Sequence, residues 1–379
     1  MNSTKTNKKS IILIVLVIYV ITIFTGCFPS SENSQESKIS TLDTANIAKK
    51  SHIKKSFSSI NVDADIVYPK ADCFDTYKVE MVEFDLNELE TIFIKDKNNI
   101  EITKETDTDY SDYTAYILNS DNENLGIFRD FFEYTTSDYD DLSYFLTSKD
   151  YPVGFEDMAD CFKSKQLSSI DKEDALETVM KVINKLDLPV NKTPEIYSLD
   201  SQSLNNRSES LNTEEEYREM NIKYEFSKSD EAYLFVFNSQ TNSLNHCDRY
   251  ISVFQDGIPT YGGEVYAVVN SKGLIMFGAY GMYDIKETLS TDERIIDTDT
   301  VFDIINNKYK NIKAEVTVVS LEPYYFPVKK TSTAETAELT PVWIVKSNES
   351  VTEQSEKGNT TINSIQYYII DAITGKVIK

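Results

Sequence analysis

The chain has 379 residues, a formal net charge of −24 and a sequence pI near 4.5. Such an acidic chain lacks the basic surface that neutralises phosphates, which excludes nucleic acid as a partner and argues against adhesion of the mature surface to anionic lipid. With 40% hydrophobic and 12% aromatic residues the chain can bury cores, and its length predicts two or three domains.

The N-terminus has the pattern of a secretion signal. A basic segment, residues 1–10, precedes an uncharged apolar run, residues 11–24. As a helix this run spans about 21 Å, short of the ~30 Å hydrocarbon core of a bilayer, which favours a signal peptide over a transmembrane helix. The run ends in Phe24-Thr25-Gly26-Cys27, which resembles the lipobox of bacterial lipoproteins, with Phe24 where that family usually has Leu.

The lipobox resemblance implies cleavage of residues 1–26 and a diacylglyceryl anchor on Cys27, at the extracellular face of the cell membrane. Two acyl chains hold a protein firmly at a bilayer, whereas one holds it only marginally. Residues 1–26 carry three Lys and no acid, so their removal leaves a net charge of −27. The polar residues 27–55 predict a flexible tether, because burial cannot offset their ordering entropy. An uncleaved signal anchor is the alternative.

Residues 56–165 are predicted to form an N-terminal α+β domain. Alternating apolar residues predict strands at 60–68 and 77–84, and residues 86–94 fit a short helix. An aromatic segment at 128–134 fits no single type of element.

Residues 166–290 are predicted to form a first helix-plus-antiparallel-sheet unit. Acidic residues from Asp171 load the first turn of a helix, as the helix dipole favours, and an apolar stripe runs from Leu176 to Leu186. A polar spacer at 191–216 comes before strands at 222–226, 233–237, 250–254, 264–269 and 274–277.

Residues 291–379 repeat this order and are predicted to form a second unit. Asp297 is a cap candidate, and Val301, Phe302, Ile305 and Tyr309 mark the apolar face of a helix. Strands follow at 316–321, 342–345 and 366–370, with polar insertions at 329–338 and 347–363. The predicted fold class is therefore α+β, an N-terminal region followed by two such units, related by duplication or by convergent use of one motif.

Several segments of the C-terminal half together resemble those of a known protein family. They are Phe254–Thr260, Tyr324-Tyr325-Phe326-Pro327, Leu339–Val345 and the closing Tyr367–Val377. The combination resembles the YycH/YycI regulatory proteins and, more broadly, PepSY-type domains of Gram-positive bacteria, over about residues 170–379. The resemblance implies an extracytoplasmic module that binds or restrains a protein partner, such as a sensor kinase or a peptidase. Those regulators are generally held by a transmembrane helix rather than by a lipid.

Sequence motifs for catalysis are missing, since the chain contains no HExxH, GxSxG, P-loop or GxGxxG. Of the two His, His52 lies in the predicted tether, so His246 is the one candidate general base in a folded segment. It stands beside Cys247 and Asp248, but adjacent residues of a strand point to opposite sides, which favours an ordinary loop or strand edge over a thiol site. We therefore assign no catalytic residue.

Metal and disulfide signals are weak. Residues 107–111 begin like a calcium loop, but Asp112 stands where that loop has Gly and Leu118 where it has Glu, so we predict a solvated acidic loop there and at 138–141. Besides Cys27 the mature chain has Cys73, Cys161 and Cys247, whose spacings fit no metal or redox motif. Buried free thiols are the prediction, with a Cys73–Cys161 disulfide as the alternative. No metal or cofactor is expected.

The sequence favours a non-enzymatic lipoprotein that binds or regulates an envelope protein through sheet edges and an aromatic-acidic surface. Aromatic and acidic residues alternate near Phe131-Phe132-Glu133-Tyr134, although aromatics are also ordinary strand residues, and Trp343 is predicted to be core. The alternatives are a cell-wall-directed hydrolase using acidic residues and a peptide- or solute-binding lipoprotein. The pattern identifies neither the partner nor the oligomeric state.

Overall fold

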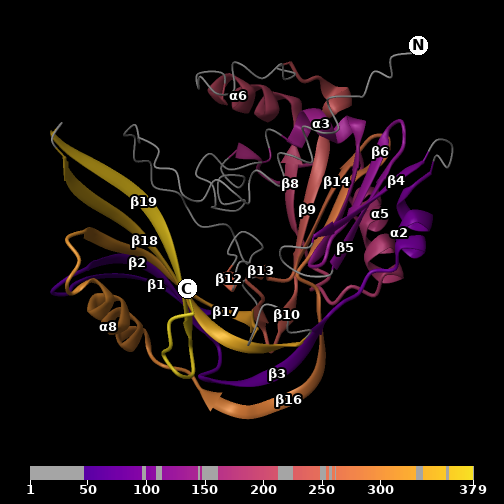
Figure 1. Cartoon of the computed structure of the whole chain (residues 1–379). Helices are drawn as coiled ribbons and strands as arrows, with labels where there is room; N and C mark the ends of the chain where they lie inside the picture. Colours follow the sequence, from indigo (N-terminus) through magenta and orange to yellow (C-terminus); the bar gives the residue numbers. More distant parts are fainter. Residues whose placement is uncertain are drawn as a thin grey trace.

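Two large β-sheets form the framework of the protein (Figure 1). The structure is a computed structural model that describes residues 47–95, 100–107, 113–143, 146, 161–211, 225–247, 253–255, 258–260, 262–329, 336–355 and 358–378. The sheets are joined where β16 follows β15, and each carries helices on its outer face (Figure 1).

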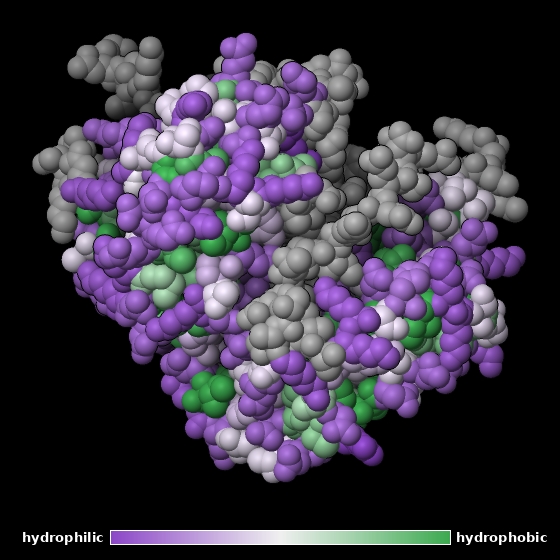
Figure 2. All heavy atoms as spheres, turned by 180° about the vertical axis from the view of Figure 1, so that it is seen from behind, coloured by the Kyte–Doolittle hydropathy of each residue, from purple (hydrophilic) through white to green (hydrophobic). Residues whose placement is uncertain are grey.

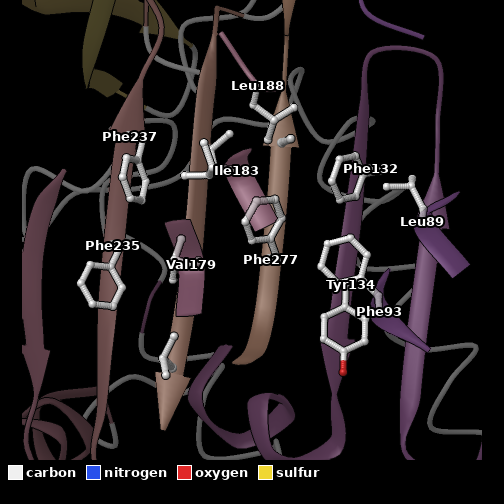
Figure 3. Close-up of a cluster of buried hydrophobic side chains, with 14 of the residues drawn as sticks. Leu89, Phe93, Phe132, Tyr134, Val179, Ile183, Leu188, Phe235, Phe237 and Phe277 are labelled. Atoms are coloured by element: carbon white, nitrogen blue, oxygen red, sulfur yellow. The ribbon is translucent and has the colours of Figure 1, made fainter. Parts of the chain in front are cut away.

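The eight-stranded sheet is antiparallel throughout, in the order β4-β5-β6-β7-β15-β14-β9-β8. Its strands are β4 (Glu101–Asp107), β5 (Tyr113–Asn119), β6 (Glu123–Ile127), β7 (Phe131–Thr136), β8 (Glu195–Leu199), β9 (Ala232–Asn238), β14 (Glu264–Asn270) and β15 (Gly273–Tyr280). Two helices, α2 (Leu86–Phe93) and α5 (Lys172–Lys185), cover its outer face. Figure 3 shows Val179 and Ile183 of α5 and Phe93 of α2 against Phe235, Phe277 and Phe132 of the sheet.

The opposite face of this sheet packs against other elements. Leu142 of α3 (Ser137–Ser143) and Leu204 of α6 (Ser201–Leu211) share a buried cluster with Leu234 and Val268 of the strands. A short 3-10 helix, η1 (Lys228–Asp230), leads into β9.

The seven-stranded sheet has the order β1-β2-β17-β18-β3-β16, and β19 pairs with the later part of β18. Its strands are β1 (Ile47–Ser56), β2 (Asn61–Pro69), β3 (Cys73–Met81), β16 (Tyr283–Arg294), β17 (Glu315–Val328), β18 (Thr336–Ser355) and β19 (Gly358–Asp371). The pair β2–β17 is parallel and the other pairs are antiparallel. Helix α8 (Thr298–Tyr309) packs against Val318, Trp343 and Ile370 of this sheet.

The α+β prediction is wrong: the protein is mostly β, and its sheets do not follow the predicted N-terminal region and two PepSY-like units. The predicted N-terminal region makes no sheet of its own, because β1–β3 join C-terminal strands and β4–β7 join strands from the middle of the chain. Apolar alternation identifies a strand and its buried face but leaves its neighbours open. The sequence pattern therefore did not predict which strands pair across such long separations in the chain.

Individual elements agree better with expectation. The predicted helix N-termini are confirmed, because the Asp171 carboxylate accepts from Asp174 N and the Asp297 carboxylate accepts from Thr300 N. The predicted polar spacer at 191–216 instead contains β8 and α6, and the polar insertion at 347–363 lies in the long β18–β19 hairpin. Cross-strand pairs of hydroxyl and amide side chains, such as Thr352 with Thr361, support that hairpin. Strand β1 occupies the end of the predicted tether.

The two sheets are also connected by a group of contacts that we call the inter-sheet junction. It contains the short hairpin β10 (Gln240–Thr241) and β11 (Leu244–Asn245), while β12 (Val253–Gln255) and β13 (Ile258–Thr260) form a separate hairpin. At the tip of the first hairpin, Asn242 Nδ2 donates to Tyr77 Oη at 2.6 Å and to Tyr325 Oη at 3.3 Å. The hairpin that follows β9 of the eight-stranded sheet is thereby bonded to β3 and β17 of the other sheet.

We predict that Ile305→Ala in α8 lowers the free energy of unfolding by about 2–5 kcal/mol, because it removes a fully buried side chain. The matched control is Ile312→Ala, which truncates an isoleucine that is 50% exposed, and its effect should stay within about 0.5 kcal/mol. Urea unfolding followed by Trp343 fluorescence measures both changes. Equal effects of the two substitutions would contradict the placement of α8.

Candidate functional site

His246, the one general-base candidate in a segment predicted to fold, lies in the inter-sheet junction, while His52, predicted to lie in the tether, belongs to β1. Its side chain is 4% exposed, its Nε2 lies 2.9 Å from Thr241 Oγ1, and its backbone N donates to Ser239 O. Burial lowers its pKa to about 4, so the imidazole is neutral at physiological pH. A Cβ atom on Gly263 would lie 3.1 Å from Nδ1, which shows how closely the backbone covers the ring. This imidazole packs the junction and has no access to a substrate in solution.

None of the three described cysteines, Cys73, Cys161 and Cys247, forms a disulfide. Cys247 is fully buried and its backbone N donates to Tyr325 O, while Cys73 and Cys161 are partly buried. The alternative Cys73–Cys161 disulfide does not form, and the burial predicted for all three thiols holds for Cys247 alone. Asp248 and the predicted lipidation residue Cys27 lie outside the described residues.

The described acidic residues show no metal site, and residues 138–141, predicted as a solvated loop, belong to α3. Asp107 ends β4, residues 108–112 lie outside the described part, and Asp138 of α3 forms an ion pair with Lys272 at 2.8 Å. Across the described ranges, no group of three or more His, Cys, Asp or Glu side chains is arranged to hold a metal ion. In the same ranges no helix is both long and apolar enough to cross a membrane.

The aromatic-acidic segment divides between the two faces of its sheet. Phe132 and Tyr134 enter the core beneath α2 (Figure 3). Phe131 and Glu133 contact residues of the cluster on the opposite face. There the rings of Phe128, Phe131, Tyr280 and Tyr266 are stacked in that order, with neighbouring centroids 4.5, 4.9 and 5.1 Å apart. The sequence marks this segment by its combination of aromatic and acidic residues but predicts no element for it, and the two tyrosines come from distant strands.

Glu133 anchors this ladder of rings. Its carboxylate accepts hydrogen bonds from Tyr266 and Tyr280, and both of its cross-strand neighbours, Gly126 and Gly278, lack side chains. A Cβ on Gly278 would lie 3.1 Å from the Tyr266 ring and one on Gly126 would lie 2.7 Å from Phe128. The rings cover bare backbone, an arrangement that stabilises glycines within a sheet. The acid is engaged in packing.

A polar cavity of about 420 Å³ lies at one end of the eight-stranded sheet. Its charged lining consists of Lys95, Glu123, Asp138 and Lys272. Glu123 accepts from Tyr134 Oη at 3.1 Å and from Lys95 N at 3.0 Å, and Lys272 pairs with Asp138. Both carboxylates that line the cavity are therefore already bonded to groups of the protein itself.

The most distinctive exposed feature is the edge strand β16. Figure 2 shows hydrophilic residues over most of one face of the protein, with small separated hydrophobic patches. Among described residues the large exposed hydrophobics are Ile102, Ile285, Leu289 and Ile312. Ile285 and Leu289, 49% and 47% exposed, belong to β16, and Ile102 belongs to the edge strand β4. Exposed apolar residues thus concentrate on open sheet edges.

The backbone of β16 is open on one side. It pairs with β3 and with no other described strand, over twelve residues. Ile285 stands opposite Val79, which is fully buried in a cluster with Phe74 and Leu339. The apolar cluster under the sheet therefore continues to an edge where an added strand would cover it. Three register shifts curve β16 strongly, which limits unselective pairing along its length.

We predict opposite pKa shifts for the two histidines. His52 Nδ1 and Nε2 lie 2.8 and 2.7 Å from carboxylate oxygens of Asp65 and Asp63, and these hydrogen bonds raise its pKa above 6.5, whereas burial lowers the pKa of His246 to about 4. Long-range ¹H–¹⁵N NMR over pH 3–9 resolves both rings.

The stability consequences have opposite signs. His246 makes the free energy of unfolding rise with pH between about 4 and 6.5, because the unfolded chain binds the extra proton there. His52 contributes stability that is present below 6.5 and is lost as pH rises through its raised pKa. Asp65→Asn should lower the pKa of His52 and leave that of His246 unchanged. A His246 ring that titrates near 6.5 would contradict its burial.

Comparisons with known proteins identify a shared fold and no family. No family model matches the chain, and no curated protein matches it. A crystal structure of an uncharacterized protein from Eubacterium rectale ATCC 33656 is similar, with a TM-score of 0.57 and 17% sequence identity, over 86% of this chain and 93% of that chain. At this identity the likeness shows the fold alone, so the two-sheet architecture is shared with a second protein and the resemblance to YycH/YycI proteins stays a prediction.

Proposed function

We propose that this protein is a non-enzymatic, lipid-anchored extracytoplasmic protein that binds an envelope protein through the open edge of β16. The observation that carries the proposal is the combination of a strand edge that no other described strand covers with the exposed side chains of Ile285 and Leu289. Such an edge binds an extended segment by backbone hydrogen bonds, while side-chain contacts select the segment.

Charge defines the preferred partner. Strand β16 carries four acidic residues and two basic ones, and the whole chain has a net charge of −24. A segment with basic side chains beside apolar ones therefore complements this edge. Long-range attraction accelerates its association and makes the rate depend on ionic strength.

The lipobox-like Cys27 supports a location at the extracellular face of the cell membrane. The resemblance to YycH/YycI proteins supports a sensor kinase or a peptidase as the class of partner. The buried state of His246 and the packed state of Glu133 support a binding role over the rival hydrolase. Turnover of wall fragments by the purified protein would overturn the non-enzymatic part of the proposal.

The lipid anchor is tested with Cys27→Ala in intact cells. We expect the native chain to begin at a diacylated Cys27 and the variant to lose both cleavage and lipid, because the thiol is the acyl acceptor. Mass spectrometry of the N-terminus reads both outcomes. An unmodified Met1 in the native protein, or unchanged processing of the variant, would refute the anchor.

The binding edge is tested with the double variant Ile285→Lys/Leu289→Lys. We expect its crosslinking yield to an envelope partner in intact cells to fall at least about tenfold, since two apolar side chains that the partner would bury become charged. Thermal stability should change little, because both side chains are exposed in the free protein.

Matched controls place lysine at the other exposed isoleucines. Ile312→Lys lies outside any strand and should leave the crosslinking yield unchanged. Ile102→Lys tests β4, the edge of the other sheet. Loss of the partner with Ile102→Lys, and not with the β16 variant, would show that the proposed edge is wrong.

A further inference from the structure

The ring of His52 joins the two outermost strands at one edge of the seven-stranded sheet. His52 belongs to β1, the edge strand, and stands directly opposite Asp65 of β2. Its Nδ1 lies 2.8 Å from Asp65 Oδ1, and its Nε2 lies 2.7 Å from Asp63 Oδ1. Both nitrogens of one ring therefore face a carboxylate of the neighbouring strand, and we call these three side chains the β1 latch.

One protonation state of the ring satisfies this geometry. A neutral imidazole has a single N–H, so its other nitrogen would point a lone pair at a carboxylate oxygen. The imidazolium donates from both nitrogens and forms two charge-assisted hydrogen bonds. The β1 latch is therefore complete when His52 carries a proton. Loss of that proton breaks one of the two bonds and removes a positive charge from between Asp63 and Asp65.

The other charged groups on this face of the sheet leave Asp65 dependent on His52. Lys54 Nζ lies 2.8 Å from Asp63 Oδ2, so Asp63 keeps a cation in either state of the ring. Among the described residues Asp65 forms its ion pair with His52, and its neighbour on β17 is the uncharged Ser320. Strand alternation and pairing place four further charged or titratable residues on this face: Lys50 of β1, Glu322 of β17, Lys346 of β18 and Tyr367 of β19.

We propose that the β1 latch is a proton-dependent switch: protonated His52 keeps β1 docked on β2, and loss of the proton raises the fraction of molecules in which β1 is detached. Among described strands β1 pairs with β2 alone, so it can leave without breaking another pairing. Its departure opens the outer backbone edge of β2 to an extended segment, while the parallel pairing of β2 with β17 stays in place.

The direction of the switch follows from the two carboxylates. Hydrogen bonds with Asp65 and then Asp63 raise the pKa of His52 above its ordinary value of 6.5. The contribution of the ring to docking is therefore complete below pH 6.5 and is lost as pH rises through the raised pKa. His246 does not titrate in this window, because its pKa is about 4. The extracellular location, which rests on the proposed function, would expose the β1 latch to the pH outside the cell.

Hydrogen exchange tests the switch on the full chain in detergent, from pH 5.5 to 8.5. The exchange rate of each β1 amide is divided by its intrinsic rate at the same pH, and the amides of β14, inside the other sheet, serve as the internal reference. We expect protection of β1 to fall about two- to fivefold, the range that exposed ion pairs give. The midpoint should coincide with the titration of the His52 ring measured by NMR, and protection of β14 should not change.

Variants identify the ring as the cause. His52→Gln cannot gain a proton, so its β1 protection should show no step over this range. His52→Lys keeps a positive charge throughout, so β1 should stay protected up to pH 8.5. The matched control is Lys55→Gln, which removes the ion pair with Asp299 from the opposite face of the same strand and should keep the step.

Two results would overturn the switch: β1 protection that is constant with pH in the native chain, or an equal step in the native chain and in His52→Gln. Where His52→Gln leaves β1 unprotected at every pH, His52→Lys decides, since a step that persists without the histidine ring refutes the proposal. None of these readings involves the lipid or the edge of β16. Failure of the switch therefore leaves the proposed function standing, and failure of the proposed function leaves the switch standing.

Discussion

The fold depends on the position of β3, which lies between β18 and β16 in the seven-stranded sheet. Residues near position 77 must find partners near 288 and 339, so the loop-closure entropy of more than 200 residues is lost before these contacts form. The alternating burial of β3 fixes the register, because a shift by one residue would expose Phe74 and Val79. Every other element of the sheet assembles around this requirement.

Several hydrogen-bonded polar groups lie where the sheets meet, while the cluster beneath α5 is built mainly of apolar side chains. Phe235, Phe277 and Ile183 form an apolar core beneath α5, whereas the junction holds His246, Asn242 and the hydroxyls of Tyr77 and Tyr325. Directional bonds specify one relative placement of two sheets that apolar packing alone would leave adjustable. The cost is a set of buried polar groups that each need a particular hydrogen-bond partner.

Local chemistry was predictable from the sequence and long-range pairing was not. The caps at Asp171 and Asp297, and the turn in which Asp371 accepts from Ile373 N and Thr374 N, depend on residues three positions apart or fewer. By contrast, the stacking of Tyr266 and Tyr280 on Phe131 requires the order of strands β7, β15 and β14. The outer part of the β18–β19 hairpin was missed because its paired residues are largely polar, so these strands lack the apolar alternation by which a strand is predicted. The exposure of Ile285 follows from being last in the sheet, a property of assembly.

The position of β1 determines how the protein responds to a pulling force at its N-terminal side. Strand β1 is the outermost strand of its sheet and the first described element after the N-terminal segment, so tension on that segment acts on Ile47 and peels β1 from β2. Hydrogen bonds loaded in this direction break one after another, and the ion pairs of Lys54 and His52 with Asp63 come under load in turn. A pull at the N-terminus would therefore detach a ten-residue strand while the parallel β2–β17 contact and the core beneath α8 remain intact. The strand would extend the reach of the protein under force and return when the force is released.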